Sequence, residues 1–88
     1  MSKLSKILEQ ELRKHGLSRQ GLARSAGLSD SIVTKIMNDN LKVSVDACAR
    51  IAIALSLDPF YLLQARVDDE MKELQTKLSE GYEDVRKI

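Results

Sequence analysis

Residues 17–36 carry the pattern that most restricts what this chain can fold into. Ser18 precedes a stretch in which small and large apolar residues recur at helical spacing, so its hydroxyl is expected to cap a short helix. The apolar members of that stretch are Leu22, Ala23 and Ala26. Gly27 follows where a helix must stop, because a residue without a Cβ enters the left-handed region at no steric cost. The pattern predicts a helix and a sharp turn.

A second short helix is expected directly after this turn. Ser29 is its expected cap, Leu28 is placed to pack against its first turns, and Val33 and Ile36 stand three apart as inward anchors. Two short helices joined in this way can cross at a steep angle. The remaining face of the second helix is polar and consists of Asp30, Ser31, Thr34 and Lys35.

The rest of the chain also has helical periodicity, so we expect an all-α fold of five helices. The first begins after Ser2 and ends at Gly16, and its apolar stripe is Leu4, Ile7, Leu8 and Leu12. A fourth helix is expected from Ser44 to about Leu55, with Val45, Cys48, Ile51, Ala52 and Leu55 on its inner side. Asp58 and Pro59 have the favoured order for starting a fifth helix, and Phe60, Leu62 and Leu63 are expected to close the core.

These features together resemble the Cro and lambda-repressor-like (XRE-like) helix-turn-helix family of small bacterial and phage regulators. The resemblance covers roughly residues 4–66. It rests on Leu22 and Ala23, Gly27, Val33, Ile36 and the run from Ile51 to Leu63. It implies a five-helix DNA-binding domain over residues 1–66, with double-stranded DNA as the partner and the second motif helix in the major groove.

The same resemblance implies individual roles. The residues expected to contact bases are Asp30, Ser31 and Lys35, with Thr34 on the same face. The residues expected to contact phosphates are Arg19, Asn38, Asn40 and Lys42.

Three residues stand out against this pattern. Met37 stands where many members of the family have Glu, and Asp39 where many have Gly. Because Asp tolerates the left-handed conformation better than most residues, the loop at 38–40 is still expected to turn. Asp30 repels phosphates unless it accepts a hydrogen bond from a cytosine amino group, so its alternative role is to help cap its own helix.

Charge is unevenly distributed along the chain. Residues 1–66 hold ten Lys or Arg against six Asp or Glu, a net charge of +4, and residues 67–88 hold four against seven, a net charge of −3. The net charge of +1 for the whole chain is therefore the sum of a basic body and an acidic tail. A homodimer would double the charge of the body, which is one reason to expect a dimer.

Composition excludes several other classes of function. With 88 residues the chain can build one small core, and with three aromatic residues and no Trp it lacks a stacking platform for single strands. No run of 18 apolar residues and no secretory leader is visible, and Cys48 is the single cysteine, so we expect a cytoplasmic protein. No catalytic, cofactor-binding or metal-binding constellation is recognisable. We therefore expect no enzyme, no cofactor and no metal.

Residues 67–88 have a heptad spacing. Val67, Met71, Leu74 and Leu78 are four, three and four apart, and Val85 and Ile88 continue the phase past Gly81. Three structures remain open for this segment: a helix that self-associates, a helix that packs back on its own domain, and a disordered tail.

Two functions follow from the sequence. The first is a homodimeric transcription regulator, more a repressor than an activator, that binds an inverted repeat. The alternative is a protein-interaction module, or an antitoxin or controller component, whose long C-terminal helix binds a partner protein.

Overall fold

The computed structural model describes residues 2–39 and 42–86, with side chains as far as Ser79, and this part of the chain consists of five helices without strands. The five are α1 (Lys3–His15), α2 (Arg19–Ala26), α3 (Asp30–Met37), α4 (Val45–Ala54) and α5 (Pro59–Arg86). The predicted all-α class and the number of helices are confirmed.

Serine side chains set the start of the first four helices. The Oγ atoms of Ser2, Ser18, Ser29 and Ser44 each accept a hydrogen bond from the backbone N–H three residues later, at 3.0–3.2 Å. The carboxylate of Asp58 accepts in the same way from the N–H of Phe60 at 3.0 Å, next to the helix-starting proline. These caps satisfy amides that no helical carbonyl can reach. All five expected starts are confirmed.

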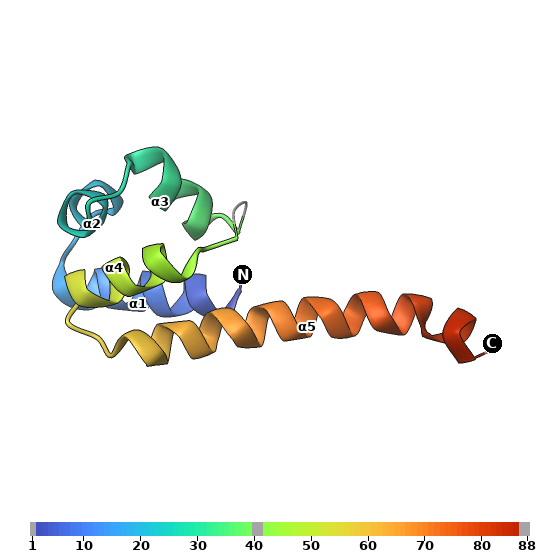
Figure 1. The fold of residues 1–88 in the computed structure, drawn as a ribbon. Coiled ribbons are helices and arrows are strands. Elements are labelled where there is room, and N and C mark those ends of the chain that lie inside the picture. The colour runs from blue at the N-terminus through green and yellow to red at the C-terminus, as the bar shows by residue number, and fades with distance from the viewer. Residues whose placement is uncertain (1, 40–41, 87–88) are drawn as a thin grey trace.

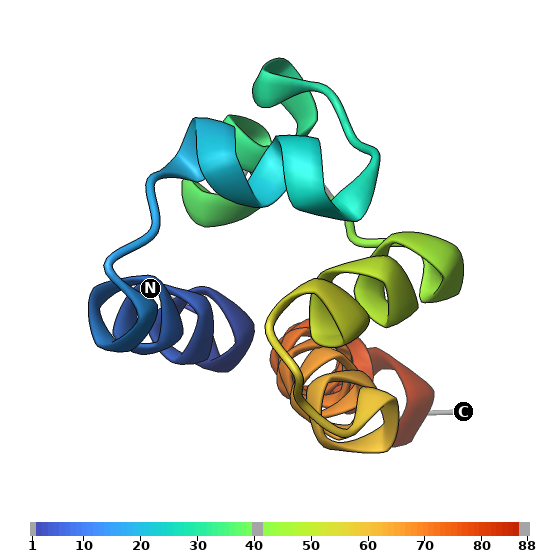
Figure 2. The same cartoon turned by 90° about the vertical axis from the view of Figure 1, so that its left-hand side faces the viewer.

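The helices form a small body from which one helix projects. α5 packs on α4 and α1, whereas α2 packs on α3 and α4. Figure 1 shows α2 and α3 on one side of the body and α5 on the other, with the second half of α5 running out past the body. The view along α5 in Figure 2 shows the same separation of α2 and α3 from α5. The outer side of α3 is therefore uncovered in the monomer.

All five helices contribute to one core. Its largest fully buried side chains are Leu8, Leu22, Val33, Cys48, Ile51, Leu55 and Leu62. Small residues such as Ala23 and Ala52 are also fully buried, which lets the short helices approach closely.

Two residues expected in the core are exposed, so those predictions were wrong. Phe60 is 76% exposed because it lies two residues, about 200° of helix, from the buried Leu62. Val45 is 57% exposed because it begins α4 at the border of the buried stripe, roughly 80° from the centre of that stripe. Val43, just before the helix, is buried.

The first turn of α1 is anchored to α5. The carboxylate of Asp69 accepts hydrogen bonds from the N–H groups of Lys3 at 2.8 Å and Leu4 at 3.0 Å. Beside them, the Lys3 ammonium pairs with Asp68 at 2.7 Å, an exposed pair that adds little to stability. Since free amides at a helix start need acceptors, Asp69 fixes where α5 lies against α1.

The segment after residue 66 continues α5. It is helical as far as Arg86. The side chains of residues 71–79 are all exposed, so this part does not pack back on the body. No helix in the described part of the chain is long and apolar enough to cross a membrane.

We expect Leu22→Ala to lower the free energy of unfolding by about 2–5 kcal/mol, because it empties space in the centre of the core. Ile53→Ala is the matched control, since Ile53 is a helical aliphatic residue that lies exposed on α4, and it should change stability by no more than about 0.5 kcal/mol. Urea unfolding followed by far-ultraviolet circular dichroism measures both. Equal losses for the two variants would contradict this assignment of the core.

Candidate nucleic-acid interface

The outer side of α3 carries the four residues expected to face a groove. Their side chains are all exposed: Asp30, Ser31, Thr34 and Lys35. The other side of the same helix is buried and consists of Val33, Ile36 and Met37. The structure thus brings the four polar residues together on a helix held from behind by three apolar anchors.

The ends of α3 have the charges that a helix dipole favours. Ser29 is the cap, with its Oγ accepting from the N–H of Ile32 at 3.2 Å, so capping is not the role of Asp30. Asp30 lies in the first turn and Lys35 in the last. A negative charge near the start of a helix and a positive charge near its end both stabilise it. The outer side of α3 nevertheless has no net charge.

Arg19 is the first residue of α2, and its side chain is exposed. The cap at Ser18 occupies the N–H of Gly21 at 3.0 Å, and the earlier amides of this turn point out of the helix end. An arginine beside a positive helix end is a suitable place for a phosphate.

The turn between α2 and α3 is made at Gly27. Gly27 has φ of 69°, in the left-handed region, and the N–H of Leu28 donates to the carbonyl of Ala23 at 2.8 Å. A Cβ on Gly27 would lie 3.3 Å from the guanidinium of Arg50 on α4. Glycine is therefore favoured at position 27 by its backbone angle, whereas the exposed Arg50 side chain can move aside.

The loop after α3 turns at Asp39, whose φ of 61° confirms that this aspartate accepts the left-handed conformation. The Asp39 carboxylate accepts a hydrogen bond from the N–H of Ser2 at 3.0 Å, which joins the end of α3 to the start of α1. Asn38 is exposed beside it. Asn40, a predicted phosphate contact, lies outside the described residues.

The Asp39 contact also affects its ionisation. Partial burial raises the pKa of the Asp39 carboxyl, but hydrogen bonding with Ser2 and Ser5 lowers it by more, so the pKa lies below its ordinary value. The ionised form is therefore the one that holds the loop against α1.

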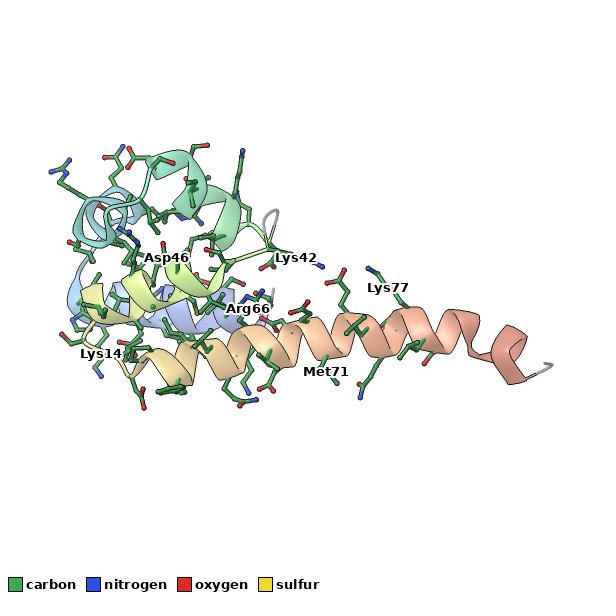
Figure 3. The ribbon with its side chains drawn as sticks, in the orientation of Figure 1. Lys14, Lys42, Asp46, Arg66, Met71 and Lys77 are labelled. Atoms are coloured by element: carbon green, nitrogen blue, oxygen red, sulfur yellow. The ribbon has the colours of Figure 1, made fainter. Side chains whose placement is uncertain are left out.

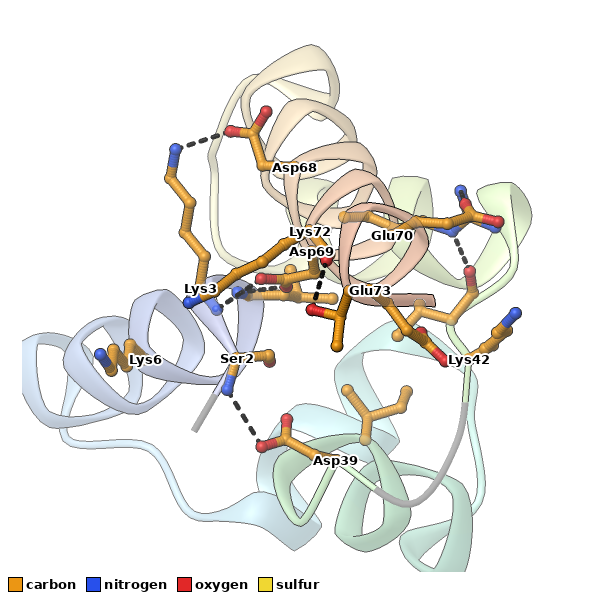
Figure 4. Close-up of a pocket in the computed structure, with 15 residues that line it drawn as sticks. Ser2, Lys3, Lys6, Asp39, Lys42, Asp68, Asp69, Glu70, Lys72 and Glu73 are labelled. Carbon is orange, nitrogen blue, oxygen red and sulfur yellow. Dashed lines mark hydrogen bonds and ion pairs between the residues drawn. The ribbon is translucent and has the colours of Figure 1, made fainter. Parts of the chain in front are cut away.

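Lys42 lies apart from the outer side of α3. It is exposed and lines a cleft of about 770 Å³ between the loop, the start of α1 and α5, where Figure 4 shows it near Glu73. The cleft is lined by five cationic and five acidic side chains. Lysine and arginine in it are Lys3, Lys6, Lys42, Arg66 and Lys72, and the acids are Asp39, Asp68, Asp69, Glu70 and Glu73. This balance gives the cleft no excess of positive charge.

Several structurally important residues were not found from the sequence. Asp69 accepts a hydrogen bond from the N–H of Leu4, 65 positions away, and no local sequence pattern predicts such a pair. The Nε–H of Arg66 donates to the carbonyl of Val43, tying the segment before α4 to α5. Met37 is buried in the core beside the predicted anchors Val33 and Ile36. Burial also raises the pKa of the Cys48 thiol, as expected for a small core residue.

We expect the stability of this protein to fall with acid in part through Asp39. A carboxyl whose pKa is lowered by folding stabilises the folded state above its unfolded pKa of about 3.9, and that contribution is lost as the pH falls through the lower folded pKa. Asp39→Asn keeps the shape and the tolerance of a left-handed backbone, so it should lower stability at pH 7 and flatten the loss between about pH 5 and pH 2. Urea unfolding at a series of pH values measures this.

The matched change Asp30→Asn removes one negative charge from an exposed aspartate outside this contact. If both variants gave curves parallel to that of the natural protein, the loop contact would carry no charge-dependent stability.

One of three comparisons with known proteins found a match, and it agrees with this geometry. A search of curated proteins and a search of solved structures each found no match. Among residues 2–39 and 42–79, no group of three His, Cys, Asp or Glu residues is placed to hold a metal ion. A family model described as a helix-turn-helix domain matches residues 1–68, which include α1 to α4 and the start of α5. The chain belongs to this helix-turn-helix domain family, a class of domain that binds DNA.

Proposed function

We propose that the protein is a sequence-specific regulator of transcription, acting as a repressor, that binds an inverted-repeat operator as a homodimer. The observation that carries this proposal is the outer side of α3, which is polar, exposed and braced from behind by buried Val33, Ile36 and Met37. In this proposal residues 1–66 bind DNA and residues 67–88 join the two copies. The protein acts in the cytoplasm, where a bacterial operator lies.

The dimensions of α3 support its entry into a major groove. With its side chains an α-helix is about 10–12 Å across, and the major groove of B-DNA is about 12 Å wide. The side chains offer distinct chemistry to base edges. Lys35 donates to guanine O6 or N7, Ser31 hydrogen-bonds to either kind of edge, and Asp30 accepts from a cytosine amino group. Thr34 places a methyl group where it can contact thymine.

Phosphate contacts supply most of the affinity in this proposal. Arg19, at the positive end of α2, holds the backbone on one side of the groove, and Asn38 and Asn40 hold it on the other. Lys42 lies in the cleft beside Glu73, so it adds to the positive charge of the domain and not to this contact. The net charge of +4 on residues 1–66 favours this arrangement, and a dimer presents twice that charge. Such contacts fix register and leave sequence selection to α3.

A two-fold dimer defines the spacing of the operator. Its two recognition helices must meet major grooves about 34 Å apart, one helical turn of DNA. The five-helix order and the glycine turn support placing the domain among the Cro and lambda-repressor-like members of the class.

The test of the proposed function is a selection of bound duplexes from a random library with the purified protein at about 100–150 mM salt, where non-specific binding is weakened. We expect an inverted repeat with half-site centres about 10 base pairs apart. A library that yields no motif, with binding that disappears at modest salt, would contradict the proposal.

We expect Arg19→Ala and Ser31→Ala to fail in different ways. Arg19→Ala removes a phosphate contact, so it should weaken binding to all sequences alike and reduce the salt slope by about 1. Ser31→Ala should relax the preference at one operator position, since each good base contact discriminates by about 1–3 kcal/mol. Fluorescence anisotropy with matched and mismatched duplexes at several salt concentrations separates the two effects.

Lys14→Ala is the control for simple loss of positive charge. Figure 3 shows Lys14 on the opposite side of the body from α3, so this variant should bind almost as the natural protein does. If Arg19→Ala left both affinity and salt slope unchanged, or Lys14→Ala matched its loss, this mode of docking would be wrong.

A second candidate function is a protein-interaction module, including an antitoxin or a controller that binds a partner protein. It is favoured by the absence of net charge on the outer side of α3 and by the exposed apolar residues of α5. It predicts tight binding of a partner through α5 with no salt-sensitive affinity for duplexes. A toxin-like reading frame next to the gene would also favour it.

A further inference from the structure

An apolar stripe runs along the outside of α5. We call it the outer stripe and define it as the five large apolar residues on that side that are 42–76% exposed: Phe60, Val67, Met71, Leu74 and Leu78. Met71 lies nine residues, two and a half turns, from the fully buried Leu62. It therefore projects from the side of α5 opposite the core, and Figure 3 shows it pointing away from the body.

We propose that the outer stripe pairs with the outer stripe of a second copy of this chain, with the two α5 helices antiparallel and centred between Lys72 and Glu73. This inference rests on the homodimer of the proposed function and adds its geometry. In this register Met71 is level with the partner's Leu74, and Val67 is level with the partner's Leu78. Alternating four- and three-residue spacing is the pattern by which helices interlock along a seam.

The spacing of the outer stripe supports this register. Val67 and Leu78 lie at equal distances from the point between residues 72 and 73, and so do Met71 and Leu74. A two-fold axis at that point therefore covers these four residues with the matching residues of the partner. The body does not obstruct the pair, because it packs on the opposite side of α5.

Charges beside the outer stripe favour the antiparallel direction. Glu70 and Lys77 flank the stripe along the same edge. Within its own helix, Glu70 pairs with Arg66 at 3.3 Å, and Lys77 pairs with Glu73 at 3.3 Å. In the antiparallel register Glu70 lies beside the partner's Lys77, and symmetry repeats this pair. On the other edge Asp68 meets the partner's uncharged Gln75. No like charges meet among these four residues.

A parallel pair lacks this complementarity. Its edges would place Glu70 beside the partner's Gln75 and Leu63 beside the partner's Asp68, and neither contact joins opposite charges. The two directions also differ in where they leave the bodies. Antiparallel helices place them at opposite ends, with the attachment points near residue 63 or 64 about 27 Å apart along the axis, whereas parallel helices place them at the same end.

Cysteine cross-linking tests the direction. Val67→Cys and Leu78→Cys are prepared as two separate full-length proteins, which leaves Met71 and Leu74 in place at the centre. Cys48 is 1% exposed, so it is shielded from oxidation while the protein is folded. Cysteines that have not formed a disulfide are alkylated before the chains are denatured for analysis. We expect covalent dimers from the mixture of the two variants and few from either variant alone. Linked homodimers of each variant, with no linked heterodimer in the mixture by mass spectrometry, would overturn the antiparallel register.

A charge exchange tests the edge contacts independently. In the antiparallel dimer, Glu70→Lys or Lys77→Glu alone places like charges across the interface, so each should raise the dimer dissociation constant several-fold. The double variant restores opposite charges across the interface but not the pairs within each helix, with Arg66 and Glu73. Recovery in the double variant therefore reports on the contact between chains. Two single losses that simply add in the double variant would contradict the contact.

Sedimentation velocity on the natural protein and DNA binding by the same sample separate this inference from the proposed function. A dimer with the expected cross-links supports the inference. A dimer cross-linked in the parallel sense overturns it and leaves the dimeric regulator standing. A protein that stays monomeric on its own and on an operator overturns both the register and the homodimer, and operator binding then shows whether the DNA-binding role survives.

Discussion

The burial of three residues on the inner side of α3 is the contact on which the candidate interface depends. An isolated eight-residue helix is not stable in water, so α3 exists only because Val33, Ile36 and Met37 are packed into the core. Full burial of such side chains is worth about 1.5–3 kcal/mol each. The outer side of α3 can therefore be wholly polar, because it makes no contribution to holding the helix in place.

A few local signals and long-range hydrogen bonds explain how so small a body is held together. Serine caps begin four of the five helices, and left-handed glycines end the first two, so each turn is set by one or two residues. Long-range hydrogen bonds then fix the helices relative to one another. Asp69 joins α5 to α1, and Asp39 joins the end of α3 to α1. The start of α1 thus connects the candidate recognition helix with the helix that projects from the body.

How far the sequence predicts this structure depends on whether a feature is local. Caps, glycine turns and the inner stripe at Val33 and Ile36 were predictable, because each depends on residues within four positions of one another in the sequence. Phe60 and Val45 were misplaced, because an apolar residue at the border of a stripe or on the reverse of a helix cannot be distinguished by composition alone. The role of Asp69 could not be predicted at all, because its partners at the start of α1 are distant in sequence.

The candidate site divides in the same way. The four polar residues of α3 follow from helical periodicity, whereas the position of Lys42 in a cleft with acidic residues of α5 depends on tertiary packing. Met37 is buried in the core as a third anchor of α3, which the sequence did not predict. The exposed heptad residues of α5 were visible as a pattern, but the sequence alone left their surroundings open.

The most direct test of the central claim, that the outer side of α3 binds duplex DNA, is a titration of isotopically labelled protein with a selected duplex, followed by backbone amide resonances. We predict the largest changes in α3, at the start of α2 and in the loop that follows α3, with small changes along the exposed half of α5. Changes confined to α5, with α3 unaffected at saturation, would contradict the claim and assign binding to a different surface.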